Sequence, residues 1–148
     1  MADYYNTKAY LPLNGLHIFI INDDRRANFT LKLSLPRFGA KVFYPEKFNN
    51  GIEAITQMPQ CNMVLIDIQS VTMSQGIKIT NQIINLGKEP PIDVIAILDQ
   101  SDQQSSGILS QAGSKGTLFK QWSTDQIERY LAPFALHGSS VIPTTSIY

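Results

Sequence analysis

Short apolar runs rich in β-branched and aromatic residues alternate along the chain with stretches of helical length. The runs lie at residues 16–22, 40–44, 62–67, 93–98 and 116–120. They show little polar alternation, which is typical of strands that are covered on both faces of a sheet. Because a helix-length segment follows each strand, right-handed crossovers between parallel strands are expected. The pattern therefore predicts an α/β three-layer sandwich around a five-stranded parallel sheet.

The intervening segments carry apolar residues at helical intervals. They cover residues 25–38, 49–58, 74–87, 102–113 and 123–136. In the first segment Leu31 and Leu35 lie one turn apart, and Pro36 is expected to weaken the final turn. In the last segment Ser123 and Gln126 have the spacing of a capping box. We predict a lead-in at 1–15, one domain at 16–135, and a flexible tail or the start of a linker at 136–148.

Composition narrows the class of protein. The chain has 148 residues, with 12 basic and 12 acidic side chains and no net charge. A neutral balance disfavours nucleic acid or an anionic membrane as a partner. The single cysteine, Cys61, excludes an internal disulfide, and no apolar run approaches the ~20 residues of a membrane span. We expect a cytoplasmic domain with no nucleic-acid or membrane partner.

Acidic residues and a lysine follow the predicted strands. Asp23 and Asp24 come after the first strand, Asp67 ends the third, and Lys120 closes the fifth. Sites in open parallel sheets form at the carboxyl ends of the strands, where these side chains are expected to meet. Clustered carboxylates suit Mg²⁺, and a carboxylate can attack phosphorus. The plainer alternatives are that the first two acids cap a helix and that the other two residues are incidental.

The chain resembles the receiver domains of two-component response regulators over about residues 16–135. The resemblance is carried by "INDD" after the first strand, "VLIDIQ" at the third and "GTLFK" at the fifth. It implies a flavodoxin-like sheet in the order 2-1-3-4-5 and a weak Mg²⁺ site. It also implies that Asp67 is the phosphoacceptor, held rigidly while facing solvent, and that Lys120 contacts the phosphoryl group. The family's acidic pair aligns with Asn22 and Asp23, Asp24 follows, and Gln69 would offer its backbone carbonyl to the metal.

Four positions depart from the family pattern. Leu98 stands where the family has a hydroxyl, and leucine cannot donate a hydrogen bond. Asp99 replaces a small residue and adds a negative charge near an incoming phosphoryl group. Thr117 replaces the switch aromatic, and Gln121 replaces the proline after the lysine. The resemblance therefore implies an atypical, or pseudo-, receiver in which the acceptor and the lysine persist without the parts that transmit a signal.

We interpret the chain as a receiver-like signalling module that acts through protein–protein contact and is not an enzyme. Its expected partners are a histidine kinase, a phosphotransfer protein, an output domain or a second copy of the chain. The main alternative is a conventional Mg²⁺-dependent receiver that a histidine kinase phosphorylates on Asp67. A flavodoxin-like nucleotide binder or enzyme is the third hypothesis, but it needs a glycine-rich loop after the first strand, and "NDDRRAN" contains no glycine.

One surface is a candidate for partner binding. The family resemblance points to the face built from the fourth helix, the fifth strand and the fifth helix, where this chain offers Gln126 and Tyr130. Aromatic side chains supply a large contact area at small entropic cost, so Tyr130 is the candidate anchor. The alternative that Tyr130 belongs to the core stripe with Ile127 and Phe134 has equal weight.

Overall fold

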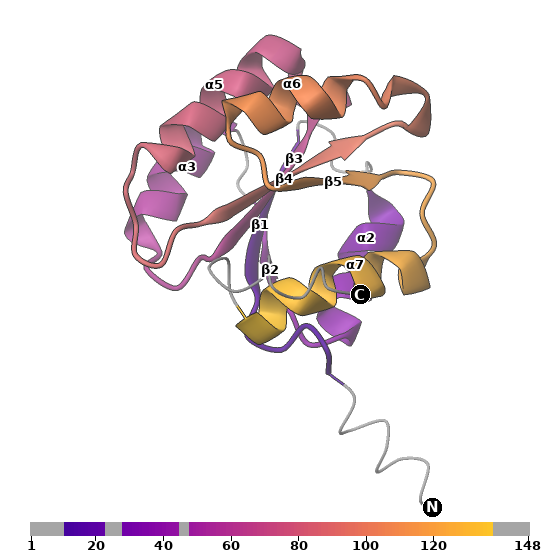
Figure 1. Ribbon diagram of the computed structural model, residues 1–148. Helices are drawn as coiled ribbons and strands as arrows, with labels where there is room; N and C mark the ends of the chain where they lie inside the picture. The colour runs from indigo at the N-terminus through magenta and orange to yellow at the C-terminus, as the bar shows by residue number, and fades with distance from the viewer. Residues whose placement is uncertain (1–10, 23–27, 45–47, 138–148) are drawn as a thin grey trace, which may run out of the picture.

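The computed structural model describes residues 11–22, 28–44 and 48–137, which form a sheet between two layers of helices (Figure 1). The strands are β1 (His17–Ile21), β2 (Lys41–Phe43), β3 (Met63–Asp67), β4 (Asp93–Leu98) and β5 (Gly116–Phe119). All neighbouring strands pair in parallel, in the order β2-β1-β3-β4-β5. The predicted flavodoxin-like sheet is confirmed. Asp23 and Asp24 lie outside the described residues.

Helices cover both faces of the sheet. They are α2 (Phe29–Arg37), α3 (Phe48–Gln57), α4 (Ile68–Val71), α5 (Met73–Ile84), α6 (Ser105–Ala112) and α7 (Thr124–His137), with a 3₁₀ turn η1 (Gln100–Asp102). Figure 1 shows α2 and α7 on one face and α3, α5 and α6 on the other. The sequence did not predict α4, a single turn that begins as soon as β3 ends.

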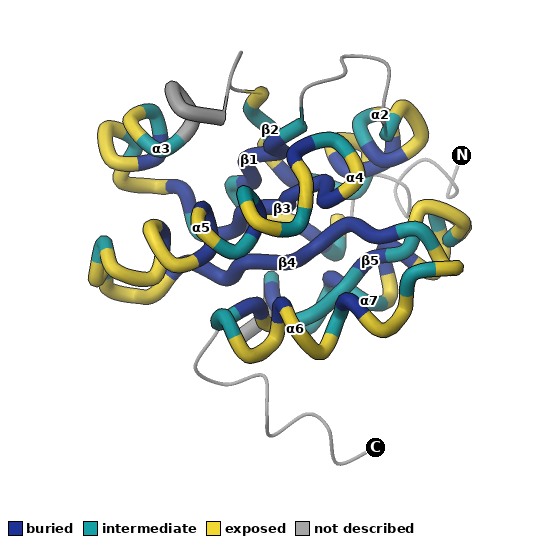
Figure 2. The backbone as a smooth tube through the Cα atoms, turned by 90° about the horizontal axis from the view of Figure 1, so that it is seen from above, coloured by how far each residue is buried: buried dark blue, intermediate teal, exposed yellow. Residues whose placement is uncertain are grey.

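The core consists of two apolar layers, one on each face of the sheet. Every residue of β3 and β4 is buried, as Figure 2 shows for the centre of the molecule. One layer packs Leu31 and Leu35 of α2 and Leu131 of α7 against the sheet. The opposite layer includes Ile79 of α5 and Leu109 of α6. Burying one such side chain contributes about 1.5–3 kcal/mol, so this packing holds the strand ends in place.

The ends of the described helices follow the sequence closely. α2 ends at Arg37, one residue after Pro36. At the start of α7, Gln126 N donates to Ser123 Oγ at 3.2 Å, and Ser123 N donates to Gln126 Oε1 at 2.8 Å, which confirms the capping box. Leu13, within the predicted lead-in, is fully buried in the core. In the described part of the chain, no helix is long and apolar enough to cross a membrane.

Candidate functional site

The carboxyl ends of the strands bring together residues that are far apart in the sequence. Asp67 is the last residue of β3, and Lys120 directly follows β5. Ile21 of β1 pairs with Ile66 of β3, so Asn22 follows in register alongside Asp67. Continuation of the parallel register is what sets these residues side by side at one edge of the sheet.

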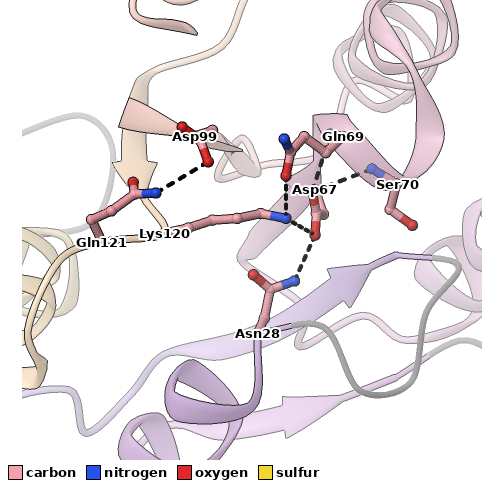
Figure 3. A network of polar contacts seen from close by, with 7 residues as sticks. All are labelled: Asn28, Asp67, Gln69, Ser70, Asp99, Lys120 and Gln121. Carbon is pink, nitrogen blue, oxygen red and sulfur yellow. Dashed lines mark hydrogen bonds and ion pairs between the residues drawn. The ribbon is translucent and has the colours of Figure 1, made fainter. Parts of the chain in front are cut away.

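Asp67 and Lys120 form an ion pair at this edge (Figure 3). Lys120 Nζ lies 3.1 Å from Asp67 Oδ2, and the Asp67 side chain is 0% exposed while that of Lys120 is 25% exposed. The same ammonium donates to Gln69 Oε1 at 2.8 Å. A buried carboxylate without a partner would be costly, so the lysine compensates the charge that the fold has taken out of water.

The other oxygen of Asp67 organises the chain that follows it. Oδ1 accepts from Gln69 N at 3.1 Å and, at a longer 3.4 Å, from Ser70 N. Asp67 is the N-cap residue of α4, so its carboxylate satisfies the free amides at the start of that turn. The aspartate at the end of β3 therefore has a structural role in addition to any chemical one.

Asn28 supplies a further donor to the carboxylate. Its Nδ2 donates to Asp67 Oδ2 at 2.8 Å, as Figure 3 shows from the start of α2. The sequence had suggested no role for this residue, because it lay inside a stretch predicted to be helical. The two residues are 39 positions apart, and no motif or periodicity reveals a contact over that separation.

Asp67 is therefore closed off, contrary to the expectation that it faces solvent. Donors from α2, α4 and the end of β5 surround its two oxygens. The physical reason is that a carboxylate at a sheet edge recruits the nearest N–H groups, since an unsatisfied buried acceptor costs more than ordering its donors. The Gln69 side chain accepts from Lys120, and the role of its backbone carbonyl toward a metal stays a prediction.

Asp99 and Gln121 form a separate polar pair beside this site. Asp99 Oδ1 accepts from Ser101 N at 2.9 Å and from Ser101 Oγ at 2.7 Å, and Gln121 Nε2 donates to Oδ2 at 3.1 Å. The bonds from Ser101, then that from Gln121 and the charge of Lys120, lower the Asp99 pKa. Asp99 is thus held as a partly exposed carboxylate in its own network, where solvent screens its repulsion of an anion.

Leu98 belongs to the core rather than to the polar edge. Its side chain is buried in the layer that also contains Leu109. Its backbone carbonyl accepts from Lys120 N at 2.9 Å, which helps to fix the lysine at the end of β5. The residue therefore positions Lys120 through its backbone, and its side chain offers no polar group to the site.

Tyr130 points toward β5. Its ring makes edge or tilted contacts with Trp122 and Phe134, with centroids 5.3 and 6.0 Å away. Thr117 N donates to the Tyr130 hydroxyl at 3.1 Å, and burial raises the Tyr130 pKa. A Cβ on Gly116 would overlap this hydroxyl, so only glycine leaves room for the contact. The half-buried ring packs against the core layer that contains Leu131. Gln126 is exposed, and its side chain accepts from Ser123 N at the cap of α7.

The oxygen atoms at this edge are of the kind that bind hard cations. Asp67 offers carboxylate oxygens, and the adjacent Asn22 carries an amide whose Nδ2 is buried without a hydrogen-bond partner among the described residues. Within those residues no three His, Cys, Asp or Glu side chains cluster in a way that could hold a metal. Since Asp67 is already surrounded by donors, a cation would have to displace one of them.

Comparison with known proteins shows which solved structures share this fold. No family model matches the sequence, and no curated protein matches it. Several solved structures do. A two-component response regulator with a GGDEF domain superposes with a TM-score of 0.70 at 16% identity, covering 83% of this chain and 50% of the other. The chain therefore spans half the length of that regulator.

Two isolated receiver domains match along nearly their whole length. That of the sensor histidine kinase PA1611 from Pseudomonas aeruginosa PAO1, with magnesium coordinated in its active-site cleft, has a TM-score of 0.66 and 18% identity, covering 79% of this chain and 94% of the other. That of Ssk1 from Saccharomyces cerevisiae, co-crystallised with the histidine phosphotransfer protein Ypd1, has a TM-score of 0.69 and 13% identity, covering 84% and 91%. The chain has the receiver-domain fold of two-component response regulators.

Proposed function

We propose that the chain is a receiver-like signalling module that retains a carboxylate site but lacks a working switch, and that it acts through contact with another protein. One observation carries the proposal. Asp67 and Lys120 pair at 3.1 Å at the carboxyl edge of a receiver-like sheet, while no polar side chain at Leu98 links them to the rest of the domain.

The retained pair can support phosphoryl acceptance. An Asp67 oxygen would attack the phosphorus of a phosphohistidine, forming an O–P bond as the N–P bond breaks and the imidazole leaves with its electron pair. Lys120 can neutralise the negative charge before and after the transfer. Its ammonium pairs with the carboxylate first and can bind the phosphoryl oxygens once it releases the carboxylate. Both residues come from rigid strand ends, which favours a fixed geometry of attack.

The same geometry argues that acceptance is slow. Asp67 is fully buried, and its Oδ2 already contacts both the Asn28 amide and the Lys120 ammonium. A phosphoryl donor can reach an oxygen only after one of these contacts opens. Because these contacts cover Asp67, we expect it to be phosphorylated much more slowly than an open carboxylate would be.

We propose that the domain has lost the ability to transmit a signal from Asp67 to its other surfaces. In a switch, one ligand biases an element that has two arrangements. Here the buried Leu98 has no hydroxyl to draw toward a phosphoryl group, and Thr117 is too small to act as an aromatic lever. Tyr130, an aromatic residue of that face, accepts a hydrogen bond from the Thr117 amide at 3.1 Å.

Magnesium is the cofactor that the site would take, weakly. The PA1611 receiver domain was crystallised with magnesium in its cleft. In this chain we propose Asp67, the Asn22 side-chain oxygen and the Gln69 backbone carbonyl as ligands, with Asp23 and Asp24 as further ligands predicted from sequence alone. A bound cation would supply positive charge against the phosphoryl oxygens.

A protein partner is supported by the surface around Asn28. The Ssk1 receiver domain was crystallised with a phosphotransfer protein. In this chain Phe29 and Leu33 lie four residues apart on α2 and are 65% and 57% exposed. This apolar pair follows directly after the residue that contacts Asp67, so a partner seated on it would lie next to the carboxylate. A second copy of the chain is the other partner consistent with this face.

A phosphotransfer assay tests the proposal. The domain is incubated with acetyl phosphate and MgCl₂, and intact mass and peptide mapping locate any added phosphoryl group, with D67N as the control. We expect slow, partial labelling on Asp67 and none in D67N. Rapid and complete labelling would instead support a conventional receiver, and labelling that persists in D67N would show that the acceptor is misidentified.

A further inference from the structure

The Asn28 side chain serves Asp67 rather than its own helix. Asn28 is the N-cap residue of α2, yet among the described residues its side chain makes no capping hydrogen bond. An asparagine at this position normally accepts from the first turn of the helix. Here its Nδ2 donates instead to Asp67 Oδ2 at 2.8 Å. The amide is thus committed to the carboxylate of a distant strand.

The backbone places Asn28 within reach of Asp67. Asn28 has φ 62° and ψ 34°, in the left-handed region that asparagine and glycine enter most readily. Its carbonyl accepts from Lys32 N at 2.9 Å, so the residue is part of the first turn of α2. That helix is anchored by the buried Leu31 and Leu35. Core packing therefore sets the position of the amide.

Asp67 has little capacity left for another partner. An ionised carboxylate offers about four acceptor positions. Donors in the described part of the chain approach both oxygens, the amides of Gln69 and Ser70 at Oδ1 and the side chains of Asn28 and Lys120 at Oδ2. A hard cation binds an oxygen lone pair and cannot share the position with an N–H group.

Asn28 is the donor that yields most easily. The amides of Gln69 and Ser70 belong to the backbone of α4 and cannot leave without unwinding it. Lys120 carries a charge and is also held by Gln69 Oε1 at 2.8 Å. Asn28 is neutral and its side chain can rotate away. A cation arriving at Oδ2 therefore displaces the Asn28 amide at the least cost.

We propose that Asn28 competes with a divalent cation for Oδ2 of Asp67 and thereby weakens Mg²⁺ binding at this site. The inference deepens the proposed function and rests on it, since it concerns the same carboxylate. Cation binding and the Asn28–Asp67 hydrogen bond exclude each other. The affinity for Mg²⁺ is thus reduced by the free energy of breaking that bond.

Two substitutions isolate the amide. Asn28→Gly removes the side chain but keeps a residue that accepts φ 62° without strain. We expect its Kd for Mg²⁺ to fall about tenfold, the effect of removing one hydrogen bond to a charged group. Asn28→Asp keeps the size of the side chain, cannot donate when ionised and adds a ligand oxygen, so its Kd should fall further. Asn85→Gly makes the same change at the exposed C-cap of α5 and should leave the Kd unchanged.

The protein carries its own reporter. Trp122 is the sole tryptophan. It lines a cavity of about 200 Å³ together with Asn28, Phe29 and Lys120. Its fluorescence during a MgCl₂ titration gives the Kd, and the amide resonances of Gln69 and Lys120 locate the bound cation. Circular dichroism establishes that each variant is folded.

Each result is decisive. An unchanged Kd in Asn28→Gly overturns the competition, and a higher Kd shows that Asn28 is a ligand rather than a competitor. If no variant binds Mg²⁺, including Asn28→Asp, there is no cation site at Asp67 and the inference fails. Labelling by acetyl phosphate, run in parallel, distinguishes a failure of the competition between Asn28 and Mg²⁺ from a failure of the proposed phosphoryl acceptance. A tighter Kd without labelling preserves the inference and sinks phosphoryl acceptance, whereas labelling with an unchanged Kd does the reverse.

Discussion

Among single residues, Asp93 lies in surroundings that disfavour a charged carboxylate. It begins β4, is only 4% exposed, and its Oδ1 lacks a hydrogen-bond partner within the described residues. Burial raises its pKa from 3.8 to about 6, against a smaller opposing effect of the Lys115 charge. The folded state therefore binds a proton more tightly than the unfolded state does, and the ionised form weakens the fold.

Stability should consequently fall as the pH rises from about 4 to about 6, with no further loss from this group above that range. We predict that Asp93→Asn raises the free energy of unfolding by roughly 2–3 kcal/mol at pH 7.5 and by almost nothing at pH 4. Urea unfolding at the two pH values measures this. An equal effect at both would mean that Asp93 is not buried as a charge.

Tyr130 and Gly116 form a coupled pair on β5 and α7. Tyr130→Phe should destabilise the fold by about 1 kcal/mol, because the Thr117 amide loses its acceptor. Gly116→Ala should cost more, since its Cβ overlaps the Tyr130 hydroxyl. In the double variant the overlap with the hydroxyl is gone and only the approach to the ring carbon at 3.0 Å remains, so the combined loss should be less than the sum. Strict additivity in urea unfolding would show that the two residues do not meet.

At the scale of single residues, sequence reasoning found the ends of strands but not what surrounds them. Asp67 and Lys120 could be placed because strand ends share an edge of the sheet. The closure of Asp67 could not, since it depends on Asn28, whose contact is set by the packing of α2. The sequence left two interpretations of Tyr130 open, and the contacts of its hydroxyl with the Thr117 amide and Gly116 show which way the side chain points.

Among the elements, α7 depends on its N-terminal cap. Ser123 and Gln126 exchange two hydrogen bonds there, at 3.2 and 2.8 Å. Ser123→Ala should lower the free energy of unfolding by about 1 kcal/mol. Ser110→Ala, at an exposed position within α6, provides the matched control and should be nearly neutral. Equal effects of the two substitutions on urea unfolding would mean that the cap contributes nothing.

The predicted elements differ from the observed ones where side chains compete with periodicity. The described helices and all of the strands agree with the predicted segments to within a few residues, because their buried faces dictate the period. The exception is α4, which covers Ile68–Val71. It is too short to have a period, and Asp67 caps it. Thr72, its C-cap residue, has φ 79°, a value that no sequence pattern announces for threonine.

For the molecule as a whole, topology was the most predictable feature. Alternating buried strands and helical segments leave few other arrangements, since crossovers are right-handed and strands covered on both faces are typical of parallel sheets. What the sequence could not supply is the state of the site. Whether a carboxylate at a sheet edge is open or closed is decided by donors that come from α2, α4 and the end of β5 together.

We propose that events at Asp67 do not reach the face formed by α6, β5 and α7. Beryllium fluoride with Mg²⁺ mimics a phosphoryl group on a carboxylate, and an amide spectrum of the isotopically labelled domain records which residues respond. We predict changes confined to the surroundings of Asp67 and Lys120, with no change in molecular mass in solution. Amide shifts that extend through α6 to Tyr130, or the formation of a dimer, would contradict this proposal and identify the domain as an ordinary switch.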